Sequence, residues 1–276
     1  MTEFLDIPGG RIAYEVSGSG PLVVLSHGIG VSRQDYRFLA PLLARAGYRV
    51  AAADLRGHGE SSTGWASITR TDIAGDLAAL IARLGGPAVI VGHSISGGAA
   101  TIAAAARPDL VTAIVEINPF TRTVRYSPAG LLRVRRYRRC LFLLGGTQLL
   151  RSLRLFLDYL DLAYPTRPAD YAGYRAAVAA KLREPGRMAE FLKTFGSPAD
   201  ADQQLPHVNG PALVIMGTLD PDFPDPRAEG DAIIAAMPAG AGTVATVDGA
   251  GHYPHAQSPE AVAELVIPFL KEHAGA

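Results

Sequence analysis

The stretch Gly92-His93-Ser94-Ile95-Ser96-Gly97-Gly98 joins a short apolar run at 88–91 to an alanine-rich segment at 95–106. The first run predicts a buried strand and the second a helix. A serine at so sharp a strand-to-helix turn stands clear of the backbone and exposes its hydroxyl. Helix and strand crowd together there, so the positions two before and two after must be small, and they hold glycine and serine. Ser94 is therefore our candidate nucleophile, although a plain glycine-rich turn would leave a similar pattern.

Strand and helix patterns alternate on both sides of this turn, and glycine- and proline-rich turns separate the first three strands. The predicted strands lie at 3–7, 11–17, 22–26, 48–53, 88–91, 112–117, 212–216 and 243–247, and the predicted helices at 38–46, 73–84, 95–106, 226–237 and 259–273.

The alternation predicts an α/β fold with a mostly parallel sheet and helices on both faces. Residues 121–205 interrupt it, because they show helical patterns and no clear strand. We predict a helical cap over the C-terminal edge of the sheet, where open α/β folds bind their ligands. The expected organisation is a core of 1–120 and 206–276 with a cap of 121–205.

A serine hydroxyl is a weak nucleophile at neutral pH and needs an adjacent base. Of the seven histidines, His252 lies in a glycine-rich loop directly after a predicted strand, so its side chain should reach the same edge as Ser94. His255, three residues on, is the alternative. His58 and His93 lie too close to turn glycines to reach across, and we expect structural roles for them.

The base in turn needs an acid that fixes its tautomer and stabilises its charged form. Asp220 follows the predicted strand at 212–216, which places it at the functional edge. Asp222 and Asp225 are nearby competitors. The other common position, after the preceding strand, holds Asn118 and no carboxylate, which favours Asp220.

An oxyanion hole should complete the site, because losing one of its donors typically costs about 10²–10³ in rate. One backbone N–H should come from Ile95, the residue after the candidate nucleophile. The second should come from the loop at 26–30, where we favour Ile29. A plain glycine turn is the alternative interpretation of that loop.

Composition narrows the possible partners. The chain has 276 residues with 26 basic and 26 acidic side chains, so its net charge does not draw it toward nucleic acid. Its single cysteine, Cys140, allows no internal disulfide and no cysteine-based metal site. The first residues include acids, and no apolar run is long enough for a membrane helix. We expect a cytoplasmic protein with a small-molecule substrate, no cofactor or metal, and no integral membrane segment.

The assembled motifs resemble the α/β-hydrolase family over nearly the whole chain. That resemblance implies an eight-stranded, largely parallel sheet with a cap after the sixth strand, and it implies that Asp220 is the triad acid. The segment 54–61 is a structural loop near the site in this family. The four motifs are Ser26-His27-Gly28, Asp54-Leu55-Arg56-Gly57-His58-Gly59-Glu60-Ser61, Gly92-His93-Ser94-Ile95-Ser96-Gly97 and Gly249-Ala250-Gly251-His252.

The residues at the turn separate this chain from several relatives. Haloalkane dehalogenases and epoxide hydrolases of this fold carry aspartate where Ser94 stands. Carbon–carbon bond hydrolases tend to carry asparagine at the position of His93. Ser96 is similar to the serine of hydrolase-related plant hormone receptors, but the other motifs resemble ordinary bacterial-type esterases. Fold alone does not settle substrate.

The cap segment 121–157 holds nine arginines and no acidic residue, among many leucines. Three interpretations fit, and we favour the first: solvated basic faces of amphipathic helices. One or two arginines could instead bind a substrate carboxylate or phosphate. A basic, leucine-rich helix could also contact a membrane surface. The apolar side chains predict a lipophilic pocket in each case.

The expected activity is acyl transfer to water through Ser94, His252 and Asp220, on a small ester, lactone or thioester. Two other functions stay open: carbon–carbon cleavage or lyase chemistry on the same triad, and a small-molecule receptor on a hydrolase scaffold.

Overall fold

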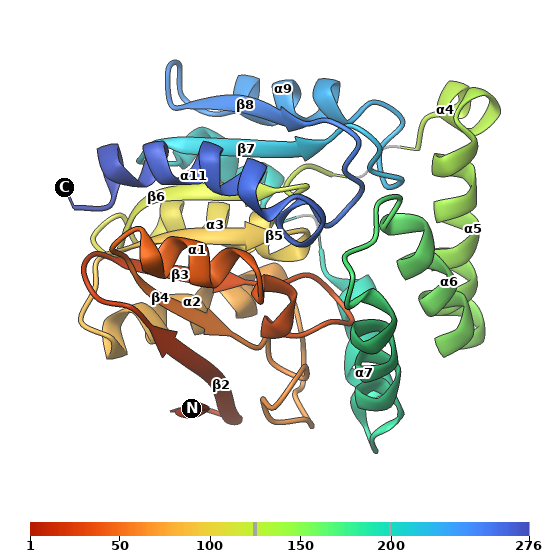
Figure 1. The fold of residues 1–276 in the computed structure, drawn as a ribbon, viewed down its shortest axis with the longest axis horizontal. Coiled ribbons are helices and arrows are strands. Elements are labelled where there is room, and N and C mark those ends of the chain that lie inside the picture. Colours follow the sequence, from red (N-terminus) through yellow and green to blue (C-terminus); the bar gives the residue numbers. More distant parts are fainter. Residues whose placement is uncertain (124–125, 199, 276) are drawn as a thin grey trace.

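The computed structural model describes residues 1–123, 126–198 and 200–275. Its centre is an eight-stranded sheet in the order β1-β2-β4-β3-β5-β6-β7-β8 (Figure 1). β1 pairs with β2 and β2 with β4 in antiparallel fashion, and all later pairs are parallel. The predicted mostly parallel sheet is confirmed. The strands are β1 (Glu3–Ile7), β2 (Gly10–Ser17), β3 (Leu22–Ser26), β4 (Arg49–Ala53), β5 (Ala88–His93), β6 (Val111–Ile117), β7 (Ala212–Gly217) and β8 (Gly242–Val247).

Helices cover both faces of the sheet, as expected. Leu39 of α1 and Val266 of α11 belong to one apolar cluster with strand residues. Leu77 of α2, Ala99 of α3 and Ile233 of α9 belong to the cluster on the other face. The core helices and the short helices of the core loops are η1 (Arg33–Tyr36), α1 (Leu39–Arg45), α2 (Arg70–Arg83), α3 (Ile95–Ala106), α9 (Pro226–Ala236), α10 (Pro254–Gln257) and α11 (Pro259–His273).

A helical insertion separates β6 from β7 and lies beyond the ends of the strands (Figure 1). It has its own apolar cluster, which Val31 and Tyr253 of the core loops join. The insertion is the predicted cap, and its exact boundaries stay a prediction. Its helices are α4 (Pro128–Arg133), α5 (Arg135–Leu150), α6 (Leu153–Ala163), α7 (Tyr171–Arg183), α8 (Arg187–Lys193), η2 (Thr194–Gly196) and η3 (Asp202–His207). Among the described residues, no helix has the length and apolar character needed to cross a bilayer.

One helix begins earlier than its apolar periodicity indicates. The pattern predicts a start at Ile73, whereas α2 begins at Arg70. Thr69 accepts a hydrogen bond from the backbone N–H of Asp72, and the Asp72 carboxylate accepts one from the N–H of Thr69. This capping box satisfies donors that the first turn leaves free, so the helix gains a turn before its apolar stripe starts.

Candidate active site

The turn after β5 holds Ser94 in an unusual backbone conformation. Its φ is +56°, a left-handed value that costs a non-glycine residue about 1–3 kcal/mol. The crowding expected around it is present, since a Cβ at Gly92 would lie 2.2 Å from the backbone oxygen of Ser96. The Ser96 hydroxyl lies 2.8 Å from that of Ser26 and donates to the carbonyl of His27 at 2.6 Å. Ser96 therefore fits the position of the usual glycine and ties the turn to the end of β3.

A cavity of about 390 Å³ lies between this turn and the cap. Ser94, Ile95, Ile29 and His252 all line it. The structure thus brings the candidate nucleophile, the candidate base and both candidate oxyanion residues to one place. Among the described residues, no hydrogen bond joins the side chains of Ser94 and His252, and such bonds are often long before substrate binds.

The loop that carries Ile29 lies directly against the turn. A Cβ at Gly28 would come within 3.0 Å of the Ser94 Cβ, so only glycine lets the two segments approach this closely. Ile95 is the first residue of α3, where a backbone N–H has no acceptor within the helix. The direction of the two N–H groups toward a substrate oxygen stays a prediction.

His252 is buried and contacts two carboxylates. Its Nδ1 lies 2.9 Å from Oδ2 of Asp220 and 3.0 Å from Oδ2 of Asp222. Burial lowers the pKa of His252, but the attraction of Asp220 and Asp222 outweighs burial and raises the pKa to about 9. The imidazolium form is therefore strongly stabilised in the unliganded protein.

Asp222 has three further polar neighbours. The Cys140 thiol donates to its Oδ1 at 2.7 Å, and the Tyr159 hydroxyl donates to its Oδ2 at 2.8 Å. Its own backbone N–H donates to Oδ1 of Asp220 at 2.9 Å. Cys140 is thus buried, and it is also a hydrogen-bond donor. In the sequence, only the two-residue spacing of Asp220 and Asp222 indicated that the two carboxylates lie close together.

The two other positions considered for the orienting acid, Asp225 and Asn118, have different hydrogen-bond partners. Asp225 caps α9, where its carboxylate accepts from the N–H of Ala228. Asn118 donates to the carbonyl of Gly251 and accepts from the N–H of Gly217, so it joins the two loops that carry the acid and the base.

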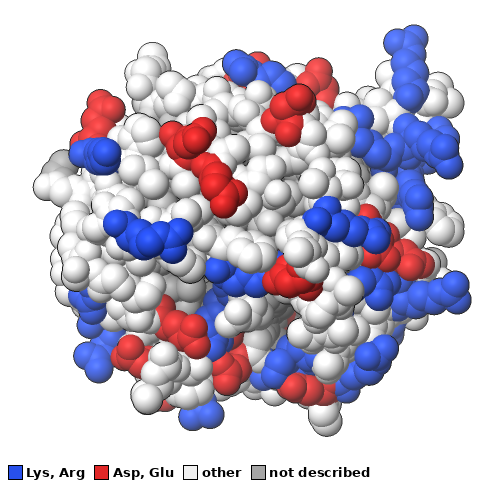
Figure 2. All heavy atoms as spheres, viewed as in Figure 1, with Lys and Arg blue, Asp and Glu red and all other residues white. Residues whose placement is uncertain are grey.

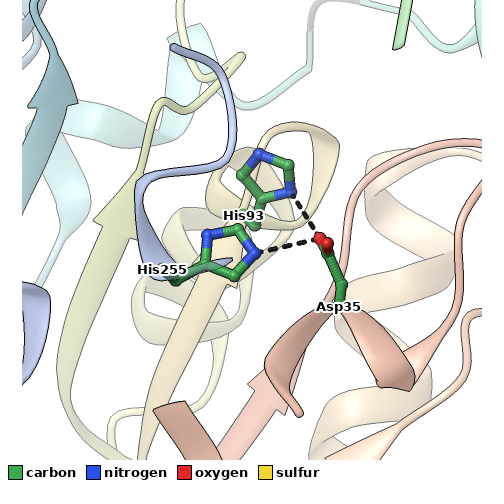
Figure 3. Close-up of side chains that lie close together, drawn as sticks. All are labelled: Asp35, His93 and His255. Atoms are coloured by element: carbon green, nitrogen blue, oxygen red, sulfur yellow. Dashed lines mark hydrogen bonds and ion pairs between the residues drawn. The ribbon is translucent and has the colours of Figure 1, made fainter. Parts of the chain in front are cut away.

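His255 and His93 form a second buried cluster with Asp35 (Figure 3). Nε2 of His255 lies 2.9 Å from Oδ2 of Asp35, and Nδ1 of His93 lies 3.5 Å from the same oxygen. Nε2 of His93 donates to the backbone carbonyl of His252 at 2.8 Å. The cluster supports the backbone of the candidate base, so His93 has the structural role expected of it. Asp35 lies in η1 within no motif, and nothing in the sequence identified it.

Among the residues that the structure describes, two buried trios have donor atoms close enough to hold a metal ion, within 4.8 Å of one another. They are Asp35 with His93 and His255, and Asp220 with Asp222 and His252. In each trio an imidazole–carboxylate hydrogen bond already joins two donor atoms. This arrangement orients side chains without a metal, and we assign none.

Comparison with known proteins identifies the family of this chain. Residues 23–265 match the family model described as the alpha/beta hydrolase family. The chain belongs to that family. A 2-(acetamidomethylene)succinate hydrolase of Mesorhizobium japonicum is 30% identical over 287 aligned residues, which cover 95% of this chain and 92% of that protein.

Solved structures agree on the fold. A bacterial membrane phospholipase A aligns with a TM-score of 0.83 and 23% identity, over 100% of this chain and 87% of the other. A meta-cleavage product hydrolase aligns with a TM-score of 0.78 and 22% identity, over 98% of both chains. At these identities the likeness concerns the fold alone, and the bond that is cleaved is a separate question.

The described cap arginines of this alpha/beta hydrolase do not line the cavity. Arg122 pairs with Glu229 at 3.0 Å, and Arg136 donates to backbone carbonyls of the loop that carries Asp220. The cavity lining includes Arg70 of α2 and none of the cap arginines that the structure describes. Arg125 lies outside the described residues.

Proposed function

We propose that this alpha/beta hydrolase cleaves a small, uncharged carboxylic acid derivative, an ester, lactone or thioester, with Ser94 as nucleophile, His252 as general base and Asp220 as the orienting acid. One observation carries the proposal: a strained serine lines the same cavity as a buried histidine, and Nδ1 of that histidine is hydrogen-bonded to the buried Asp220. This is the arrangement that makes a serine hydroxyl reactive toward a carbonyl carbon.

In the proposed mechanism the Ser94 hydroxyl attacks the substrate carbonyl carbon and gives its proton to Nε2 of His252. The N–H groups of Ile29 and Ile95 stabilise the oxyanion. The intermediate then collapses, and His252 protonates the leaving group. Water enters, loses a proton to His252 and attacks the acyl carbonyl. His252 then returns the proton to the departing oxygen of Ser94, which frees the acid and restores the Ser94 hydroxyl.

Asp220 is our choice for the orienting acid, because its Oδ2 accepts the hydrogen bond from Nδ1 of His252. Asp222 lies at almost the same distance, but both of its oxygens already accept from Cys140 and Tyr159. We therefore assign Asp222 an electrostatic role, since its charge raises the pKa of His252 without being needed to hold the ring.

The cavity wall supports an uncharged, lipophilic substrate. Its lining includes Phe120, Leu141, Leu144 and Phe195. Arg70 also lines it, but this guanidinium donates to the backbone carbonyls of Phe120 and Pro198 and to Ser197. A substrate carboxylate would have to compete with these partners. We therefore expect a substrate preference different from that of the relative named 2-(acetamidomethylene)succinate hydrolase.

The proposal is tested with Ser94→Ala assayed on short p-nitrophenyl esters beside a ketone panel. We expect ester turnover to fall by several orders of magnitude, because the variant has no hydroxyl at position 94 to attack the substrate carbonyl. The exposed Ser19→Ala is the matched control and should keep full activity. A fluorophosphonate probe should label wild type at Ser94 and leave the variant unlabelled.

Retained ester hydrolysis in Ser94→Ala would remove Ser94 from its role. Turnover of ketones with no turnover of esters would reassign the bond to carbon–carbon cleavage. Tight binding with a single round of acylation would identify a receptor instead of an enzyme.

A further inference from the structure

The outward side of α5 is cationic in its first half and apolar in its second. At about 100° per residue all of its exposed positions except Gln148 fall within a stripe about 140° wide. Its opposite side is buried in the cap, through Tyr137, Cys140 and Leu143. We call the exposed stripe the α5 outer face; its members are Arg135, Arg138, Arg139, Phe142, Gly145, Leu149 and Leu150.

Large apolar side chains gather on and beside this face. The exposed fractions of Phe142, Leu149 and Leu150 are 70%, 83% and 69%, and that of Leu132 at the end of α4 is 80%. Five of the eight exposed large hydrophobic residues in the described chain lie between 126 and 150. Such clustering marks an interaction surface, whereas single exposed apolar residues do not.

The arginines of this region have no acidic partners. Among the described residues, no carboxylate pairs with the exposed arginines of α4, α5 and the start of α6, whereas Arg107 and Arg227 elsewhere pair with Asp109 and Asp231. Figure 2 shows basic side chains projecting on the side where Figure 1 places α4 and α5. The unpaired set is Arg133, Arg135, Arg138, Arg139, Arg151 and Arg154.

We propose that the α5 outer face docks on the surface of an anionic lipid bilayer. The arginines would contact headgroup phosphates, and Phe142, Leu149 and Leu150 would enter the boundary between headgroups and acyl chains. A charged and an apolar half on one exposed helix face match the two layers of such a surface.

Other occupants fit this face less well. A second copy of the chain would bring two sets of unpaired arginines together with no acidic residue of 121–157 between them, which is repulsive. A nucleic acid would pair with the arginines but would leave Phe142, Leu149 and Leu150 in water. A bilayer of anionic lipid satisfies both halves.

The docking face adjoins the wall of the cavity. Leu141, Leu144, Gly145 and Gln148 of α5 line the cavity, and Gly145 also belongs to the outer face. A substrate dissolved in the lipid would therefore leave it beside the cavity. This last step rests on the proposed function, but the docking itself does not.

The test measures partitioning onto vesicles of phosphatidylglycerol and phosphatidylcholine in equal parts, and onto vesicles of phosphatidylcholine alone, by co-sedimentation. Wild type should bind the anionic vesicles far more strongly, with an affinity that falls as salt is added. Arg135→Gln/Arg139→Gln should lower the partition coefficient by about 20- to 30-fold, since each basic residue contributes about fivefold. Phe142→Ser/Leu149→Ser should lower it at least tenfold.

The matched control is Arg45→Gln/Arg83→Gln, which removes two exposed arginines at the opposite edge of the sheet, where α1 and α2 end. Circular dichroism checks that every variant is folded. The proposal is overturned if wild type ignores anionic vesicles, binds both compositions equally, or loses no more affinity in the α5 variants than in the control. A dimer that the α5 variants dissociate would assign the face to a second copy. Ser94→Ala should bind as wild type, so retained ester turnover together with retained binding in this variant would count against the proposed function alone.

Discussion

At His252, one imidazole nitrogen contacts two carboxylates, although one would suffice to orient the ring. The second charge has a kinetic consequence, because a base must be neutral before it can accept a proton. With a pKa of about 9, His252 is mostly protonated at neutral pH in the unliganded protein.

We therefore expect kcat/KM for an uncharged ester to rise by about tenfold per pH unit through neutral pH and to level off above about pH 9. Asp222→Asn removes one of the charges that raise the pKa of His252, so its plateau should begin at lower pH and its activity at pH 7 should increase. Asp220→Asn should instead lower the rate at all pH values, because the ring loses its orienting acceptor. The measurement is a pH–rate profile of the three proteins. Superimposable profiles for wild type and Asp222→Asn would refute the electrostatic role of Asp222.

The sequence could identify some residues of the candidate site and not others. Ser94, Asp220 and His252 could be singled out because each follows a predicted strand, and parallel strands end at a common edge. Asp35 could not, because its loop has no motif and its partners His93 and His255 are far away in sequence. The contact of Cys140 with Asp222 depends on how the cap docks, which periodicity does not encode.

At the scale of elements, the join between β5 and α3 depends on a missing side chain at Gly92. The alternation of strands and helices was predicted correctly because buried strands and amphipathic helices leave distinct periodic patterns. The start of α2 was missed because polar caps, not apolar residues, determine it.

Gly92→Ala should lower the free energy of unfolding by about 1–3 kcal/mol or more, because its methyl group would overlap the backbone oxygen of Ser96. Gly75→Ala is the control, since this exposed position in α2 has no neighbour within 4 Å and alanine favours helix. It should gain about 0.5–1 kcal/mol. Urea unfolding of both variants gives the comparison. Equal free energies of unfolding for the two variants would mean that the turn between β5 and α3 accommodates the alanine methyl group by a small shift of the backbone.

At the scale of the whole molecule, charge is unevenly distributed. Nine of the 26 basic residues lie in 121–157, so the rest of the chain holds 17 basic against 26 acidic residues. The neutral total therefore conceals a positive cap on a negative core, which fits the proposed docking.

The cap and the core are also linked mechanically through Arg136. Its guanidinium donates to the backbone carbonyls of Asp220, Phe223 and Pro224. Arg136→Ala should loosen the loop at 218–225 and lower ester turnover several-fold, whereas Arg139→Ala on the exposed side should change neither. Hydrogen exchange of that loop and steady-state kinetics measure the two effects. Unchanged exchange in Arg136→Ala would show that the loop holds its shape without the cap.

The Arg136 contact couples the position of the cap helix α5 to the loop that carries Asp220. Because Arg136 belongs to α5 and its three acceptors belong to the loop after β7, any displacement of α5 relative to the core would lengthen or break these hydrogen bonds. Under the proposed function, the position of the orienting acid then depends on where the cap lies, so a change in the cap would reach the reaction at Ser94 without touching the cavity wall.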